Sequence, residues 1–221
     1  MKLVLQLLLW LVIIFLGWKL YNSVNGPVEF NKAKEVRYTK VIKNLKDIKA
    51  AEMAHNEITG KFTGNFDSLI RFIDTAQFAN VERRDTSYAD VAKNKAFGIN
   101  EGYFIEDIVL DTLGFTPVKE ALFNGDENRY RTMMNIPIEG IDAKFELQAG
   151  KLEKSGATYS VFEAKVSKDV ILEGLDPDLI VQEKQVVSVE GVNGPSIKVG
   201  SMTEVNTSGN WPKLYDTTKE Q

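Results

Sequence analysis

The chain has 221 residues, of which 43% are hydrophobic and 26% are charged, so the part beyond its first segment has an ordinary globular composition. A formal net charge of −4, with no Lys/Arg run interleaved with aromatic residues, argues against nucleic-acid binding. The absence of cysteine excludes disulfides, thiolate metal sites and cysteine nucleophiles, and the single histidine, His55, leaves no histidine pair for a zinc site.

The first stretch, from Leu3 to Val24, is almost wholly apolar. A bilayer core of about 30 Å needs roughly 20 helical residues, and this stretch reaches that length with Trp18, Lys19 and Tyr21 at the membrane interface. A cleaved signal peptide is the alternative, but the hydrophobic region is long for one and no small-x-small cleavage site follows it. The sequence therefore predicts a single-pass transmembrane anchor over residues 1–24.

The orientation of this anchor is ambiguous from charge alone. Lys2 precedes the span, and five basic residues follow it: Lys19, Lys32, Lys34, Arg37 and Lys40. By the positive-inside rule, this count favours a cytoplasmic carboxyl side. A family resemblance described below implies the opposite, an exported head.

A long helix is expected after the membrane, over a juxtamembrane segment of residues 25–60. Asn25-Gly26-Pro27 predicts a kink or short break, because proline lacks a backbone donor and disfavours the α conformation at the residue before it. Residues 28–58 then carry an apolar stripe at three- and four-residue spacing. The expected protein-interaction residues lie on this stripe: Tyr38, Val41, Leu45 and Ile48. Packing of the stripe against a second helix of the same chain is the alternative.

Residues 61–221 predict an α+β head with a mostly antiparallel sheet and one or two packed helices. A second helix is expected over residues 66–78 with Asn65 as its cap, a helical turn over 117–123, and a turn or helix start at Asp176-Pro177-Asp178. Residues 80–102 are polar and are expected to be irregular. The strand candidates are residues 103–113, 134–141, 143–147, 159–166, 170–172 and 197–199.

The sequence contains no recognisable catalytic constellation. It has no G-x-G-x-x-G, Walker or G-x-S-x-G motif. Asp107 and Asp111 would share one face of a strand about 13 Å apart, which is too far for a glycosidase pair. The lone His55 is expected to be a surface or half-buried side chain rather than a ligand or base. We therefore expect no enzymatic activity, no cofactor and no metal.

A short pattern recurs four times: Asp followed by Ser or Thr and then by an apolar residue or Thr. The hydroxyl residues in these sequences are Ser68, Thr75, Thr112 and Thr217. The pattern resembles the acceptor site for O-glycosylation of exported proteins in the Bacteroidota. Composition gives about one match by chance. Asp-Ser and Asp-Thr are also good helix-cap and turn pairs, and that alternative stays open.

The first third of the chain carries one family resemblance. It rests on the apolar anchor, the proline, the basic helix and two short runs. The runs are Lys46-Asp47-Ile48-Lys49-Ala50-Ala51-Glu52 and Gly60-Lys61-Phe62-Thr63-Gly64-Asn65-Phe66-Asp67-Ser68-Leu69. This third resembles type IV pilins and pseudopilins, which implies a subunit that polymerises through its long helix. The processing motif of that family is missing, because Gly17 follows the hydrophobic run instead of preceding it and the span contains no acid.

Short segments along the whole chain carry a second resemblance. They are Leu20-Tyr21-Asn22-Ser23, Pro27-Val28-Glu29-Phe30, Val41-Ile42-Lys43-Asn44-Leu45-Lys46-Asp47-Ile48, Gly60-Lys61-Phe62-Thr63, Val199-Gly200-Ser201-Met202 and Gly209-Asn210-Trp211. With them the chain resembles a family of single-pass membrane proteins of the Bacteroidota. This resemblance implies an inner-membrane protein whose head faces the cell envelope, and it implies almost nothing about activity.

These patterns together predict a non-enzymatic structural or accessory subunit, anchored in the inner membrane with its C-terminal head in the periplasm. Such a subunit would work by protein–protein contacts in a multiprotein cell-envelope complex of the secretion, motility or energy-transducing type. Its expected partners are the membrane, other inner-membrane or periplasmic proteins, and further copies of this chain. One alternative is a pilin-like subunit that self-assembles through its N-terminal helix. The other is an envelope ligand-binding protein or enzyme.

Overall fold

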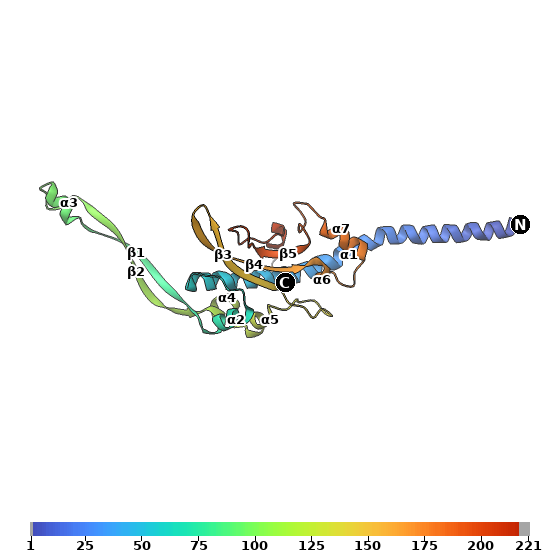
Figure 1. Cartoon of the computed structure of the whole chain (residues 1–221), viewed down its shortest axis with the longest axis horizontal. Coiled ribbons are helices and arrows are strands. Elements are labelled where there is room, and N and C mark those ends of the chain that lie inside the picture. Colours follow the sequence, from blue (N-terminus) through green and yellow to red (C-terminus); the bar gives the residue numbers. More distant parts are fainter. Residues whose placement is uncertain (1, 217–221) are drawn as a thin grey trace. The chain divides into compact units, whose positions relative to one another are not determined.

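A computed structural model describes residues 2–216 of the chain, and its fold is α+β as predicted (Figure 1). The elements in chain order are α1 (Lys2–Thr59), α2 (Phe66–Thr75), β1 (Gln77–Ala89), α3 (Val91–Ala96), β2 (Phe104–Pro117), α4 (Val118–Phe123), α5 (Glu127–Thr132), β3 (Glu146–Lys154), β4 (Ala157–Ser167), α6 (Lys168–Ile171), α7 (Pro177–Lys184), β5 (Ser196–Gly200) and the 3-10 helix η1 (Lys213–Asp216). They form two compact units. The first unit, the head unit, contains the chain up to Ile70 and from Asn128, and the second, the hairpin unit, contains Arg71–Glu127. This division differs from the sequence-based one at residues 24 and 60.

Helix α1 is continuous over 58 residues with Pro27 inside it, so of the predicted kink or short break the break is wrong. One of the clashes that a proline ring makes in a helix is with the Cβ of the preceding residue, and Gly26, which precedes Pro27, has no Cβ. The loss of one backbone donor alone does not end a helix that is strongly formed on both sides. The apolar N-terminal stretch and the helical part of the head unit therefore belong to one uninterrupted helix.

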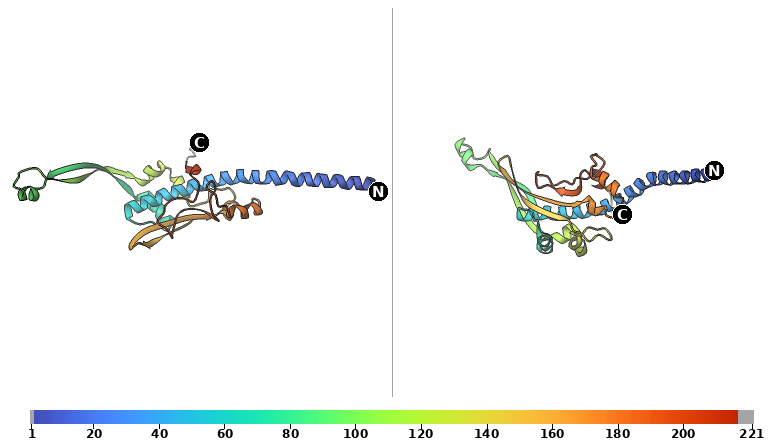
Figure 2. Two further views of the ribbon diagram at one scale, coloured as in Figure 1. Left: turned by 90° about the horizontal axis from the view of Figure 1, so that it is seen from above. Right: turned by 45° about the vertical axis from the view of Figure 1, so that its right-hand side comes forward.

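The N-terminal part of α1 is the one helix in the described chain that is long and apolar enough to cross a membrane. Figures 1 and 2 show this part of α1 clear of the other elements of the head unit. Its large apolar side chains, among them Leu11, Ile14 and Leu20, are exposed. A segment of this kind is consistent with a single-pass membrane anchor.

The C-terminal half of α1 forms the core of the head unit with a three-stranded antiparallel sheet in the order β3-β4-β5. The sheet lies along α1, with β4 and β5 in contact with the helix (Figures 1 and 2). Alternate residues of β4 are buried, as are two of β5, and the strand register places them on one face: Phe162, Ala164, Val166, Ile197 and Val199. This face packs against the apolar stripe of α1 and excludes it from solvent.

The end of β5 depends on a glycine. Gly200 has φ +76°, in the left-handed region, and a Cβ built at this position would lie 2.2 Å from the carbonyl oxygen of Phe162. Because any side chain would overlap with that neighbouring strand, only glycine allows β4 and β5 to approach so closely here.

The hairpin unit is built on one antiparallel pair, β1 with β2, which runs from the pair Gln77–Pro117 to the pair Ala89–Phe104. Its register shifts once, between Asn80 and Val81. The helix α3 connects the two strands and is capped by Asp90, whose side chain accepts a hydrogen bond from the backbone N–H of Lys93. The pair forms a sheet of two strands only.

Several elements predicted for residues 61–221 are confirmed, in the head unit and in the hairpin unit. The predicted strands at residues 103–113, 159–166 and 197–199 correspond to β2, β4 and β5, and the predicted helical turn corresponds to α4. The Asn65 side chain accepts a hydrogen bond from the N–H of Ser68, as expected of a helix cap, and Asp176 caps α7. The second helix is shorter than predicted, since α2 ends at Thr75 and β1 begins at Gln77.

Three assignments are wrong. Residues 80–102, expected to be irregular, contain most of β1, whose charged residues mimic a surface loop. Residues 134–141, expected to be a strand, contain Pro137 and Gly140 and provide only a single bridge residue, Asn135, which pairs with Lys144. Residues 170–172 were expected to be a strand, but Val170 and Ile171 are the end of α6 and Leu172 is its C-cap. A short buried apolar run fits a helical turn as well as a strand.

Candidate functional site

The predicted interaction stripe lies inside the fold. Tyr38, Val41, Leu45 and Ile48 are all buried in the core of the head unit. These side chains are therefore not available to another protein while the head unit is folded. The sequence-based alternative is packing against the second helix, whereas the elements that contact α1 most extensively are the strands β4 and β5.

A buried charge cluster fixes α7 to α1. Lys168 is fully buried, and its Nζ donates to the carbonyl oxygens of Glu183 (2.7 Å) and Val192 (2.7 Å) and to Oε1 of Glu183 (3.1 Å). Glu183 also accepts from Nζ of Lys34 at 2.9 Å and from the hydroxyl of Tyr38 at 3.2 Å. Burial alone would raise the pKa of Glu183, but the hydrogen bonds and charges of Lys34 and Lys168 outweigh it and lower that pKa. The polar groups of this buried charge cluster are hydrogen-bonded to one another, and their contacts hold α7 and Lys168 to α1.

Three further contacts hold the head unit to the same helix. Arg37 donates to the carbonyl oxygens of Ile171 (2.9 Å) and Glu173 (2.8 Å) at the C-terminal end of α6. Arg129 makes a bidentate ion pair with Asp47, in which both N–O distances are 2.8 Å. Lys46 binds η1 through the carbonyl oxygen of Tyr215 and, at 3.2 Å, through Asp216. The polar residues of α1 that follow its apolar stretch therefore hold the rest of the head unit to this helix.

The clearest anomaly in the head unit is Glu52, which is completely buried. One carboxylate oxygen accepts a hydrogen bond from the N–H of Thr63 at 2.9 Å, and the other, Oε1, has no partner. Burial raises the pKa of Glu52 to about 8, against the opposing effect of the Thr63 hydrogen bond. Glu52 therefore holds a proton at neutral pH and anchors the loop between α1 and α2.

His55 lies one turn further along α1 and binds the same loop. Its Nδ1 lies 2.6 Å from the carbonyl oxygen of Lys61 and 3.1 Å from the hydroxyl of Thr59. A carbonyl can only accept, so Nδ1 carries the proton and donates it. Together Glu52 and His55 fix the loop. The imidazole, expected at the surface or half-buried, is buried and has a structural contact.

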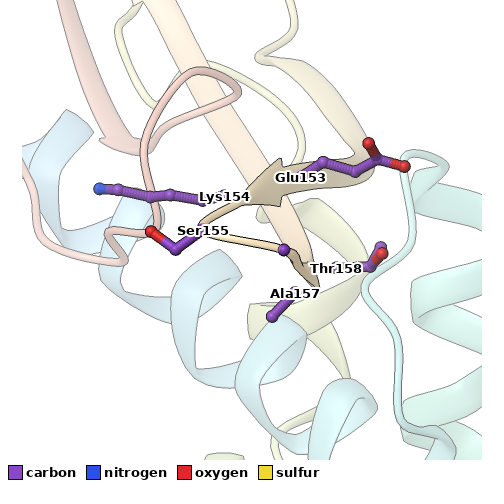
Figure 3. A pocket seen from close by; sticks show the side chains of 6 residues that line it. Glu153, Lys154, Ser155, Ala157 and Thr158 are labelled. Atoms are coloured by element: carbon purple, nitrogen blue, oxygen red, sulfur yellow. The ribbon is translucent and has the colours of Figure 1, made fainter.

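The hollows on the head unit do not assemble a chemical site. One lies at the β3–β4 turn, where Figure 3 shows the Glu153 and Lys154 side chains pointing in opposite directions from the turn. The other lies beside the α1–α2 loop and is lined by His55, Lys61 and Ser160 among others. Among residues 2–216, no group of His, Asp or Glu side chains is arranged to hold a metal ion.

The hairpin unit, in contrast, exposes apolar side chains along both strands. Leu110, Leu113 and Phe115 of β2 are 62%, 70% and 65% exposed. Further exposed apolar side chains of the pair are Val81, Tyr88, Phe104, Ile105, Ile108 and Val109. A two-stranded ribbon with two bare faces is marginally stable by itself, and exposed apolar surface of this extent marks interaction sites. The hairpin is therefore the candidate interaction surface.

The outer edges of the hairpin are open as well. Within the described chain neither β1 nor β2 has a second strand partner. Each edge consequently presents unpaired backbone N–H and C=O groups, which is the template for pairing with another strand. Sequence reasoning missed this surface, because it treated the charged run Glu82–Asp85 of β1 as a loop.

The other predicted site residues lie on exposed parts of the chain. Trp18, Lys19 and Tyr21, expected at the membrane interface, are exposed on α1 at the end of the apolar stretch. Ser68 and Thr75 on α2 and Thr112 on β2 are exposed, and Thr217 lies outside the described residues. The Thr75 hydroxyl donates to the carbonyl oxygen of Arg71 within its own helix.

No protein-family model matches this chain, and no curated protein or solved structure is significantly similar to it.

Proposed function

We propose that this protein is a membrane-anchored, non-enzymatic subunit of a multiprotein cell-envelope complex and acts through protein–protein contacts. The observation that carries the proposal is the hairpin unit, whose two strands leave their apolar side chains and backbone edges uncovered. Stable isolated domains do not normally leave such surface bare, so another protein is its natural cover.

The construction of the head unit supports a structural role. Helix α1 runs without a break from the apolar stretch into the core of the head, and buried charge contacts fasten the head to it. This arrangement suits a rigid support whose position is set by the membrane. In this proposal the apolar stretch of α1 spans the inner membrane, Trp18, Lys19 and Tyr21 lie at its interface, and the head faces the periplasm.

A pilin-like subunit is the second candidate function. A long N-terminal helix, with its first half exposed and its second half packed against an antiparallel sheet, supports this alternative. In such an assembly the exposed halves of neighbouring α1 helices would pack against one another.

The test is purification of the tagged full chain from its native membranes in a mild detergent, followed by mass spectrometry. We expect a fixed set of membrane and envelope proteins at constant stoichiometry. Recovery of this chain alone, as a ladder of homo-oligomers linked through α1, would refute the accessory-subunit proposal and favour the pilin-like one.

The orientation has a test of its own. Single cysteines introduced at exposed positions, such as Glu57 in the head, report the side of the membrane, because the natural chain has no cysteine. We expect a membrane-impermeant maleimide to label this position in cells whose outer membrane has been made permeable. Labelling only after the inner membrane is lysed would place the head in the cytoplasm.

A further inference from the structure

The two strands of the hairpin present different edges. β2 is a strand of 14 residues, about 48 Å long, and its centre is the apolar run Ile108-Val109-Leu110. From Phe104 to Leu113 it contains no lysine, proline or glycine. Lysine and proline are two of the means by which natural proteins protect an edge from pairing, and charged side chains in general are another, so only the apolar centre of β2 is unprotected. β1, in contrast, carries two arginines at its centre, Arg83 and Arg84.

The charges of β2 restrict what can pair with its edge. Acids flank the apolar run on both sides, Glu106 and Asp107 before it and Asp111 after it, and the strand contains no Lys or Arg. Asp111 is paired across the hairpin with Arg84, whereas Asp107 bonds only to the neighbouring backbone N–H of Ile108. A strand laid along this edge would therefore meet an apolar centre, with Glu106 and Asp107 at one end and Asp111, already paired with Arg84, at the other.

A second copy of β2 is a poor match for this edge. In an antiparallel pairing centred on Val109, Asp107 of each copy would oppose Asp111 of the other. Like charges directly opposite each other in a sheet are destabilising. A strand with an apolar centre and basic residues towards both ends would instead place opposite charges across from these acids.

We propose that the outer edge of β2 accepts a strand from a partner protein whose apolar centre is flanked by lysine or arginine. The added strand would bond to the N–H and C=O groups of β2 that β1 leaves unbonded, and it would compete with the Asp107 side chain for the N–H of Ile108. It would convert the ribbon into a three-stranded sheet, the smallest kind that is stable by itself. This inference rests on the proposed function and specifies the chemistry of one partner.

The experiment uses the full chain in a mild detergent and two short synthetic peptides as probes. Both peptides have a valine-rich centre, and one has lysines while the other has glutamates towards both ends. Binding is measured with a fluorescent label on the peptide, and hydrogen exchange locates the protected amides. We expect the basic peptide to bind at least about tenfold more tightly than the acidic one and to protect β2 amides rather than β1 amides.

A pair of matched variants assigns the effect to β2. The double variant Glu106→Lys with Asp107→Lys reverses two exposed acids on β2. Its control, Glu82→Lys with Asp85→Lys, reverses two exposed acids on β1. We expect the β2 variant to invert the preference between the two peptides and the β1 variant to change either affinity less than about threefold. Hydrogen exchange of the unbound variants verifies that the hairpin is still formed.

Equal affinity for the two peptides, protection confined to β1, or a β1 variant that inverts the preference would each overturn the inference. Crosslinking of β2 to β2 between copies at micromolar concentration would also overturn it and assign the edge to self-assembly. None of these results depends on whether envelope proteins co-purify with the chain, so the inference and the proposed function can fail separately.

Discussion

Replacing Glu52 with glutamine tests the physical account of the head unit most directly. The carboxyl group has a pKa of 4.5 as an ordinary side chain and about 8 when buried in the fold. The folded head therefore binds a proton that the unfolded chain loses above pH 4.5. Because the folded pKa is raised, the stability linked to this proton is fully present below pH 4.5 and is lost as the pH rises towards 8.

The magnitude follows from the gap between the two pKa values. At pH 7 the protonation of Glu52 costs the folded state about 3 kcal/mol, since each pKa unit corresponds to about 1.4 kcal/mol. Glutamine has nearly the same shape, keeps an oxygen for the N–H of Thr63 and has no proton to acquire. Glu52→Gln is thus expected to stabilise the head at pH 7 by up to about 3 kcal/mol, reduced by the cost of burying its amide.

The assay is thermal unfolding of the full chain in a mild detergent between pH 4.5 and pH 8.5, followed by circular dichroism. An increase of 3 kcal/mol corresponds to a rise in Tm of roughly 6–12 °C for a domain of this size. We expect the gain to be largest near pH 8 and to vanish near pH 4.5. The matched control is Glu57→Gln, which removes an exposed acid from the same helix and should shift Tm by about 1 °C or less at any pH.

One result would refute this reasoning. If Glu52→Gln and the natural chain differed by a constant amount across the whole pH range, the carboxyl group would not change its protonation on folding. A larger gain at acid pH than at pH 8 would contradict the sign as well.

The remaining predictions concern the buried charge cluster of Lys168 and Glu183, the end of the sheet at Gly200, and the proposed modification site at Thr112. Lys168→Met removes one of the two cations of the buried Glu183, leaves only Lys34, and should cost about 3–5 kcal/mol in chemical unfolding. The double variant with Glu183→Gln should recover part of that loss, and no recovery would show that the two side chains are not coupled. Gly200→Ala places a methyl group against the carbonyl oxygen of Phe162 and should lower stability by at least about 2 kcal/mol, and an unchanged Tm would show that β5 can move away. Intact-mass spectrometry of the protein from its native membranes should show a glycan-sized excess that Thr112→Ala reduces, and a mass equal to that of the sequence would end the O-glycosylation hypothesis.

The elements that could be predicted from the sequence are those whose burial is one-sided. The stripe of α1 repeats at helical spacing because one face of that helix is covered by the sheet, and β4 alternates because one of its faces lies on the helix. Asn65 could be recognised as a cap because capping depends on local backbone groups. In each case the determinant lies within a few residues of the element it shapes.

The elements that could not be predicted lack that one-sided burial or depend on distant residues. β1 is exposed on both faces, so its sequence carries charges where a half-buried strand would alternate. The ion pair of Lys168 with Glu183 joins residues that no local spacing rule connects. The hydrogen bond from Tyr38 to Glu183 joins residues that are still further apart in the sequence. The hairpin surface was missed for the same reason, since an uncovered surface is recognised only once the fold shows that nothing packs on it.

Exposed apolar side chains occur on the N-terminal part of α1 and on the hairpin. The two surfaces need different surroundings, because their backbone hydrogen bonding differs. The N-terminal part of α1 satisfies its own N–H and C=O groups within the helix, so its exposed side chains need only an apolar medium, and lipid is sufficient. The hairpin has exposed apolar side chains too, but each of its outer edges also carries backbone groups without a partner strand. Lipid cannot bond to those groups, and water bonds to them while leaving the apolar faces uncovered. Another polypeptide supplies both apolar contacts and backbone hydrogen bonds, and this difference supports the proposals that the hairpin binds a protein and that the apolar stretch of α1 spans a membrane.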